Sequence, residues 1–215
     1  MARPERGDTS TGKTYHVASE INRKAFDLQD DEDKEMFLKV IEEAKAKKNY
    51  KFELHNFCIM DNHFHFLITP EFGQSLSIIM KWIKMVLAIR WNHKYGKTGH
   101  LWGDRFFSRE IIDDEDFITV YNYIDQNPVK AGIVEKPEDW PWGGLHHHQV
   151  GDTRIVNAAP EWVLERLPWH RQLGTDLRPN PALYPQNQLH SGGIFNKNNS
   201  DSLINHFSGD SLRKR

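Results

Sequence analysis

The feature that most constrains the fold is a predicted β-hairpin. Two runs rich in apolar and aromatic residues, about 51–60 and 63–69, are joined by Asp61-Asn62, a dipeptide typical of tight turns. Residues i and i+2 of a strand share a face, so His63 and His65 point the same way. The phenylalanines that follow each histidine point the opposite way, into a core. The hairpin therefore predicts a sheet with one apolar face and one face that carries two histidines.

The other predicted elements surround this hairpin. A short strand at 15–18 comes first, and a helix follows the acidic residues 30–33, which suit a helix N-terminus. The pattern then predicts a helix over 75–95, a strand over 106–112 and a third helix from 113 or 114 to 128. The order strand, helix, strand, strand, helix, strand, helix indicates an α+β fold. We expect a ferredoxin-like sandwich with a central antiparallel sheet and helices on its faces.

The composition favours one folded domain with a tail. Of the 215 residues, 38% are hydrophobic, which is enough for a core. We expect a flexible arm at 1–12, the main domain at 13–168 and a largely irregular tail at 169–215. No apolar run reaches the length of about eighteen residues that a membrane span needs, and the polar N-terminus is not a secretory signal. The single cysteine, Cys58, excludes an internal disulfide and fits a reducing cytosol.

The charge distribution is more informative than the net charge. The net charge of −2 argues mildly against a nucleic-acid-binding protein. Between 81 and 109, however, the only acid is Asp104, and a local basic patch is what phosphate binding requires. The alternative is a solvated helix face, which the charge pattern alone favours. The basic residues are Lys81, Lys84, Arg90, Lys94, Lys97, Arg105 and Arg109.

The histidine pair suggests a metal site. Two imidazoles side by side on a sheet can chelate one divalent ion, with carboxylates, amides and waters as further ligands. The alternative is chance, because His-x-His is a short pattern and strands often carry polar residues on their wet face. His63 and His65 alone do not decide between these interpretations.

The third predicted helix separates two tyrosines. Its buried stripe is formed by residues at the spacing i, i+3, i+4 and i+7, namely Phe117, Val120, Tyr121 and Ile124. Tyr123 lies well off this stripe, and Asn127 shares its face. Since Tyr121 and Tyr123 are about 200° apart around a helix, they cannot reach one phosphate together, which disfavours a two-tyrosine mechanism.

Tyr123 is a candidate nucleophile. A tyrosine can attack a phosphodiester to give a phosphotyrosine and a free 3′ hydroxyl, and a metal held by the histidines and Asn127 would polarise and orient the phosphate. The alternatives are a surface tyrosine at a helix end and an asparagine that caps the helix before Pro128.

Four motifs together resemble one family. Residues 61–68 (DNHFHFLI) resemble the HUH motif of single-tyrosine transposases, and 99–106 (GHLWGDRF) resemble the loop before their last strand. Residues 123–132 (YIDQNPVKAG) closely resemble the tyrosine helix of the REP-associated tyrosine transposases. Residues 138–142 (EDWPW) match a segment that follows in that family. The resemblance covers roughly residues 13–145.

The resemblance implies specific roles. His63, His65 and Asn127 fall on the metal ligands of the family, and Tyr123 falls on the nucleophile. The family uses Mg²⁺ or Mn²⁺ and acts on single-stranded DNA near imperfect palindromic hairpins, in the prokaryotic cytoplasm. Monomers and homodimers both remain possible. Two departures are Asp61, where proline is usual, and Phe64, where smaller aliphatic residues are common.

DNA contacts are predicted from charge and aromatic character. The candidates are Lys81, Lys84, Arg90, Arg105 and Arg109 for phosphates and Trp102 for base stacking. Burial of the tryptophan is an equally good interpretation. The arm with Arg3 and Arg6 and the C-terminal residues 213–215 are further candidates, whereas the three histidines at 146–148 are expected to form a surface tract.

Three functions follow. The first is a DNA nickase and strand transferase with a covalent tyrosine intermediate. The second is a domesticated protein that binds hairpins without cutting, and the third is a phosphoesterase that uses water. The intact set of candidate site residues favours the first, because binding alone needs no nucleophile.

Overall fold

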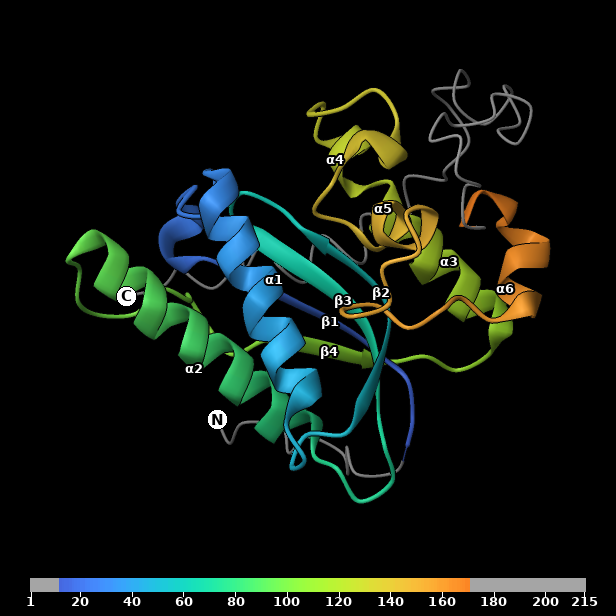
Figure 1. Ribbon diagram of the computed structural model, residues 1–215, viewed down its shortest axis with the longest axis horizontal. Helices are drawn as coiled ribbons and strands as arrows, with labels where there is room; N and C mark the ends of the chain where they lie inside the picture. Colours follow the sequence, from blue (N-terminus) through green and yellow to red (C-terminus); the bar gives the residue numbers. More distant parts are fainter. Residues whose placement is uncertain (1–11, 171–215) are drawn as a thin grey trace, which may run out of the picture. The chain divides into compact units, whose positions relative to one another are not determined.

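A four-stranded antiparallel sheet organises residues 12–170, which are the residues that the computed structural model describes (Figure 1). The strand order is β2-β3-β1-β4, and every neighbouring pair is antiparallel. This order confirms the predicted ferredoxin-like arrangement. The strands are β1 (Tyr15–Glu20), β2 (Phe52–Ile59), β3 (His63–Pro70) and β4 (Phe107–Glu110).

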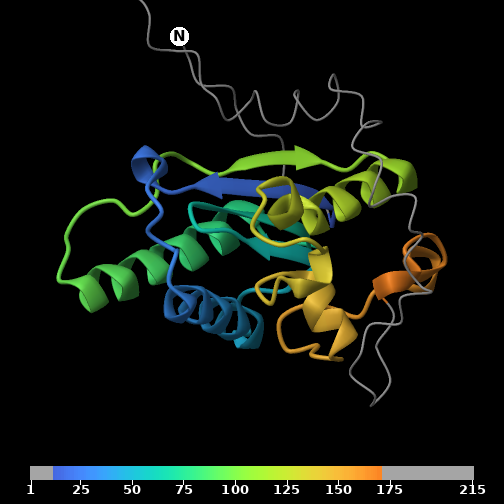
Figure 2. The same cartoon turned by 90° about the horizontal axis from the view of Figure 1, so that it is seen from above.

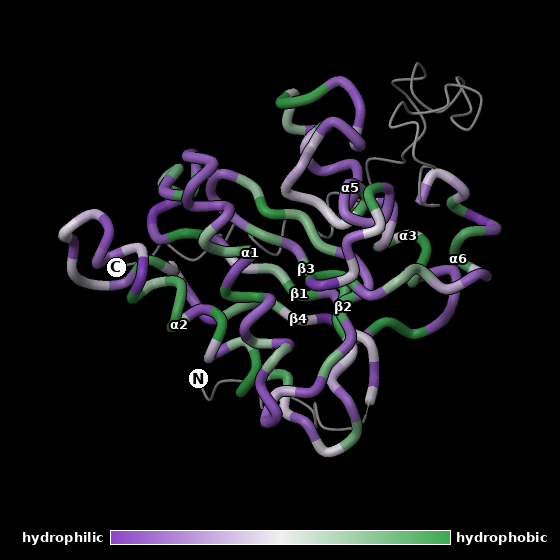
Figure 3. Tube along the Cα trace, viewed as in Figure 1, coloured by the Kyte–Doolittle hydropathy of each residue, from purple (hydrophilic) through white to green (hydrophobic). Residues whose placement is uncertain are grey.

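Helices cover both faces of the sheet. Helices α1 (Asp31–Ala46) and α2 (Leu76–Tyr95) lie side by side on one face, while α3 (Asp114–Asp125) packs against β2 and β3 on the other (Figures 1 and 2). Phe64 and Phe66 are fully buried on the α1 and α2 side, as the strand period predicts. Hydrophilic and hydrophobic residues alternate along α1 and α2 (Figure 3), as expected of helices with one buried face.

A bulge in β2 changes which residues face α3. Leu54 pairs with Ile68 and Asn56 pairs with Leu67, so His55 is the extra residue. As a result, both Leu54 and Phe57 point toward α1 and α2, although they are three residues apart. Asn56 then lies on the side of α3, fully buried.

The predicted end of the third helix was wrong. Helix α3 ends at Asp125, and a short helix, α4 (Asn127–Lys130), begins immediately after it. Pro128 lies in the first turn of α4, where its missing N–H is tolerated and its fixed φ suits a helix start. Asn127 therefore opens a new helix and does not cap the old one.

The chain after α4 completes the layer around α3. Trp140, Val163 and Leu167 join the buried side chains of α3 in one apolar cluster. The predicted surface tract of histidines was wrong, because His147 and His148 are buried. The short helices that sequence patterns did not predict are η1 (Asn22–Lys24), η2 (Pro137–Asp139), α5 (Gly144–Gln149), α6 (Glu161–Arg166) and η3 (Pro168–His170).

Several predictions fall outside the described residues. The N-terminal arm with its arginines and the tail from residue 171 onward are in this group. The described part does reach His170, just past the predicted end of the main domain, and His170 is buried. Among the helices of residues 12–170, none combines the length and apolar character of a membrane span.

Candidate active site

The two predicted histidines lie side by side at the start of β3. Their ring centroids are 5.1 Å apart and their planes are nearly perpendicular, at 84°. His65 is buried and His63 is partly buried. Both side chains leave the sheet on the face that α3 covers, because they alternate with the phenylalanines of the other face.

Tyr123 packs against His65 and against His16 of β1. Its ring centroid is 5.4 Å from that of His65 and 5.8 Å from that of His16, in edge-to-face contacts. Tyr121 is fully buried in the apolar cluster of α3, while Tyr123 is only partly buried at the edge of that cluster. The predicted separation of the two tyrosines is confirmed.

Asn127 lies one helical turn beyond Tyr123 and is hydrogen-bonded to its backbone. Its Nδ2 donates a hydrogen bond to the carbonyl oxygen of Tyr123 over 3.2 Å, which leaves the amide oxygen outside that bond. Burial lowers the pKa of His63, and a hydrogen bond that Asn127 accepts from the protonated imidazole partly opposes this shift. Burial likewise raises the pKa of the Tyr123 phenol, and Asn127 again opposes it. Asn127 therefore influences the ionisation of both the imidazole and the phenol.

The imidazoles of the site are held in their neutral form. Burial lowers the pKa of His65 well below its usual range, and the neighbouring His63 and His16 act in the same direction. Burial lowers the pKa of His16 to about 3. A metal ion requires neutral imidazole, so burial favours the protonation state that ligation needs.

The donor set fits a divalent transition metal. The Oδ1 atom of Asn62 lies 2.7 Å from Nδ1 of His63, so it accepts the Nδ1 proton and leaves Nε2 with its lone pair. Within residues 12–170 there is no group of three or more His, Cys, Asp or Glu side chains that could hold a metal ion. A metal here would therefore need the amide oxygen of Asn127 beside the nitrogens of His63 and His65, a mixed set that suits Mn²⁺ and similar ions.

Sequence reasoning missed two residues at this site. His16 on β1 stacks on His65, and the Nζ atom of Lys130 lies 4.7 Å from the ring centroid of Tyr123. The signals were present. His16 alternates with two buried apolar residues of β1, and Lys130 is part of the motif that contains Tyr123 and Asn127.

Two predicted DNA contacts lie inside the protein. Lys84 is buried, and its Nζ donates to Ser19 Oγ over 2.7 Å and to the carbonyl oxygen of Asp104 over 2.9 Å. Trp102 is buried as well, and its Nε1 donates to the carbonyl oxygen of Lys84 over 2.8 Å. Both side chains therefore belong to the α2 side of the core, with their polar donors engaged by other parts of the protein.

The other predicted contacts are on or near the surface. Lys81 and Arg105 are exposed. Arg90 forms a bidentate ion pair with Glu43, and Arg109 forms a bidentate ion pair with Asp116.

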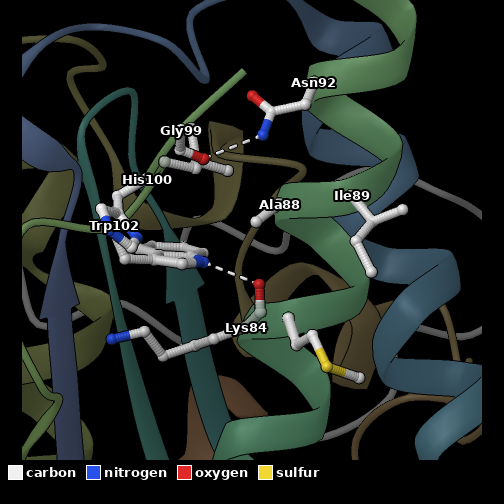
Figure 4. Close-up of a pocket in the computed structure, with 9 residues that line it drawn as sticks. Lys84, Ala88, Ile89, Asn92, Gly99, His100 and Trp102 are labelled. Carbon is white, nitrogen blue, oxygen red and sulfur yellow. Dashed lines mark hydrogen bonds between the residues drawn. The ribbon is translucent and has the colours of Figure 1, made fainter. Parts of the chain in front are cut away.

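A pocket lies apart from His63 and His65. It has a volume of about 290 Å³ and lies between α2 and the loop 99–102, where Asn92 donates to the carbonyl oxygen of Gly99 (Figure 4). Its lining includes Lys84 and Trp102, which belong to the α2 side of the sheet. The histidine site is on the opposite face.

Comparison with known proteins decides the family. The family described as Transposase IS200 like matches residues 9–127. The chain belongs to this family. It is therefore a transposase by family, which is a class of enzymes that act on DNA.

Two individual relatives show which members of the family this chain is similar to. A protein of Haemophilus influenzae described as a REP-associated tyrosine transposase is 32% identical over 126 residues, which are 54% of this chain and 69% of the relative. The REP-associated tyrosine transposase of Escherichia coli K12 is 30% identical over 103 residues, or 47% of this chain and 59% of the relative. These matches confirm the resemblance found in the motifs.

A solved structure supports the fold. The structure of a REP-associated tyrosine transposase bound to a REP hairpin superposes with a TM-score of 0.58 and 25% identity. The superposition covers 70% of this transposase and 86% of that chain.

Proposed function

We propose that this transposase cuts single-stranded DNA beside a hairpin and rejoins strands through a covalent 5′-phosphotyrosine at Tyr123. The observation that carries the proposal is the position of the Tyr123 ring, whose centroid lies 5.4 Å from that of His65, while the rings of His65 and His63 are 5.1 Å apart. A candidate nucleophile thus lies beside a candidate metal-binding pair. A site that only binds DNA would need neither of them.

We infer that His63, His65 and Asn127 hold Mg²⁺ or Mn²⁺. Once bound, the ion would polarise the scissile phosphate and neutralise charge that develops on it. The neutral imidazoles and the amide support this assignment, since each imidazole offers a nitrogen lone pair and the amide offers an oxygen. His65 can offer Nε2 only when its proton is on Nδ1, and that N–H then donates to Nε2 of His16.

The proposed reaction uses the Tyr123 phenol as the nucleophile. The Tyr123 oxygen attacks the phosphorus, a new P–O bond forms, and the bond from phosphorus to the 3′ oxygen breaks. The phenol loses its proton as it attacks, and the departing 3′ oxygen takes one up to become a hydroxyl. Burial raises the pKa of Tyr123, so this proton has to leave during the attack. Attack of a 3′ hydroxyl on the phosphotyrosine reverses the step and joins strands.

Hairpin DNA is the proposed partner. The support is the solved relative that is bound to a REP hairpin, together with the exposed Lys81 and Arg105 of this chain. Since the named relatives are bacterial, we infer that the protein acts on DNA in the cytoplasm of a prokaryote. It acts there as a monomer or a homodimer.

The test is a cleavage assay with the full-length protein and a single-stranded oligonucleotide that contains an imperfect hairpin. With Mn²⁺ or Mg²⁺, we expect a protein–DNA adduct that survives denaturant, and EDTA should abolish it. Tyr123→Phe should bind the oligonucleotide but form no adduct, while Tyr121→Phe should still form it. Binding without cleavage for the wild type would favour a hairpin-binding protein. Cleavage that persists in Tyr123→Phe would favour a phosphoesterase that uses water.

A further inference from the structure

A buried acid and a buried histidine meet at the C-terminal end of α3, the helix that carries Tyr123. The Oδ2 atom of Asp125 lies 2.6 Å from Nε2 of His170, and the two side chains are 1% and 0% exposed. Asp125 is the last residue of α3, between Tyr123 and Asn127 in sequence. His170 belongs to η3, at the end of the described chain. The contact therefore joins the helix that carries the nucleophile to a segment outside the sheet.

The other oxygen of Asp125 is held by the bulged strand. The Nδ2 atom of Asn56 donates to Oδ1 of Asp125 over 2.8 Å and also donates to the carbonyl oxygen of Tyr121 over 3.1 Å. The Oδ1 atom of Asn56 accepts from the backbone N–H of Phe57 over 2.8 Å. Both ends of the amide are thus engaged, and the end of α3 is tied to β2 as well as to η3.

Hydrogen-bond chemistry assigns the protons along this network. Nε2 of His148 lies 2.9 Å from the carbonyl oxygen of Asn157, which can only accept, so Nε2 carries the proton. Burial, with His170 beside it, lowers the pKa of His148 to about 3, so the ring is neutral and its Nδ1 accepts. Nδ1 of His170, 2.8 Å away, must then donate. Nε2 of His170 and Oδ2 of Asp125, which are 2.6 Å apart, therefore share a single proton.

We propose that Asp125 and His170 are positioning residues for the nucleophile. The proposal rests on the assignment of Tyr123 as that nucleophile. By fixing the end of α3 against η3 and β2, the pair holds the Tyr123 ring over His65 and sets where Asn127 enters the site. A buried pair with every polar atom engaged has one favoured geometry, and the loss of one member leaves the other buried and unpaired.

A matched pair of variants separates this role from a general need for stability. In Asp125→Asn, Oδ1 can still accept from Asn56, and Nδ2 can donate to Nε2 of a neutral His170, so the connection survives without a charge. Asp125→Ala removes it. His170→Phe keeps the ring that packs edge-to-face on Tyr121 but removes both nitrogens.

The experiment measures the single-turnover rate of adduct formation at saturating hairpin oligonucleotide with Mn²⁺, using full-length protein below its unfolding transition. We expect Asp125→Ala and His170→Phe to be slower by about tenfold or more, because a small displacement of a reacting group is enough for such a loss. Their Kd for the hairpin should stay within about threefold of wild type, and Asp125→Asn should keep the wild-type rate within about threefold. A wild-type rate in the folded Asp125→Ala protein would overturn the proposal, as would an Asp125→Asn protein as slow as Asp125→Ala.

Hydrogen exchange keeps the test independent of the reaction. Backbone amides of residues 118–126 should exchange faster in Asp125→Ala than in wild type, and at the wild-type rate in Asp125→Asn. If the wild type forms no adduct, the proposed function fails, yet this exchange pattern still tests the connection. Equal exchange in all three proteins would show that Asp125 does not hold α3.

Discussion

The Nδ1 atom of His65 lies 3.1 Å from the Nε2 atom of His16, and the two rings are stacked with their centroids 5.2 Å apart. Nδ1 of His16 is buried and has no hydrogen-bond partner among the described residues. Since both rings are neutral, one of the two facing nitrogens donates and the other accepts. Only the arrangement in which His65 donates leaves Nε2 of His65 able to bind a metal.

The first prediction concerns metal affinity. His16→Leu removes the acceptor for His65, so we expect Mn²⁺ to bind about tenfold more weakly, in line with other residues that orient a metal-binding histidine. His16→Gln keeps an acceptor oxygen and should bind Mn²⁺ within about threefold of wild type. Isothermal titration calorimetry measures both values. Equal affinity in the leucine variant would show that His16 does not orient His65.

The second prediction concerns Lys130, whose ammonium group lies 4.7 Å from the Tyr123 ring centroid. A cation at this distance stabilises the negative charge that develops on the phenol oxygen and on the phosphate during attack. Lys130→Met should slow adduct formation by about tenfold or more at saturating DNA. Lys130→Arg keeps the charge and should recover much of the rate. If methionine and arginine are equally slow, the shape of the lysine matters and its charge does not.

The third prediction concerns Gly144, which starts α5. A Cβ atom there would lie 2.1 Å from Oδ1 of Asn56 and 3.1 Å from the Phe57 nitrogen. Asn56 cannot move aside without losing its bonds to Asp125 and Tyr121, so Gly144→Ala should lower the free energy of unfolding by about 1–3 kcal/mol. Gly143→Ala is the control, because its Cβ would meet side chains and backbone at 3.5 Å or more. Urea unfolding of both variants checks this, and equal stability would contradict it.

The fourth prediction concerns pH. Burial lowers the pKa of His16 and His148 to about 3 and that of His55 to about 4. Below about pH 6.5 these histidines bind protons in the unfolded chain but stay neutral in the folded chain. The free energy of unfolding therefore falls as the pH falls from about 6.5 toward 4. Each such histidine contributes a slope of about 1.4 kcal/mol per pH unit in this range.

A variant of His55 isolates one contribution to that slope. Nε2 of His55 lies 2.7 Å from Thr69 Oγ1, and a glutamine can keep this bond without titrating. The Glu53 carboxylate, 3.8 Å away, is exposed and screened by solvent, so burial decides the shift. His55→Gln should therefore flatten the dependence of stability on pH between about 6 and 4. An unchanged slope would show that His55 is protonated in the folded protein.

The sheet and its first two helices could be predicted because hydrophobic periodicity and turn residues depend only on neighbours in the sequence. The tight turn at Asp61-Asn62 and the C-terminal Gly96 of α2 each set a boundary within one or two neighbours. The bulge at His55 could not be predicted, because it depends on which residues of β3 lie opposite. The end of α3 was missed for another reason: Pro128 both stops a helix and starts one.

The residues of the candidate site also fall into two groups, those that local sequence patterns could predict and those that they could not. Tyr123 and Asn127 are close in sequence, and the two histidines share a strand, so spacing alone placed each pair. His16 reaches the site only through the pairing of β1 with β3, which no local pattern encodes. The charge of Lys84 predicted a surface group, and the loop position of Trp102 left base stacking and burial equally possible. Backbone oxygens accept hydrogen bonds from both side chains inside the protein. The burial of His147, His148 and His170 depends on contacts with residues of β2 and α3 that are distant in sequence.

The most direct test of the central claim is to locate the covalent bond. Full-length protein is incubated with Mn²⁺ and a hairpin oligonucleotide, denatured, and digested with trypsin and nuclease, and mass spectrometry then identifies the peptide that carries a nucleotide. We predict a 5′-phosphodiester on Tyr123 and a free 3′ hydroxyl on the released strand. A nucleotide on Tyr121 or on any other residue, or cleaved DNA without a modified peptide, would contradict the account.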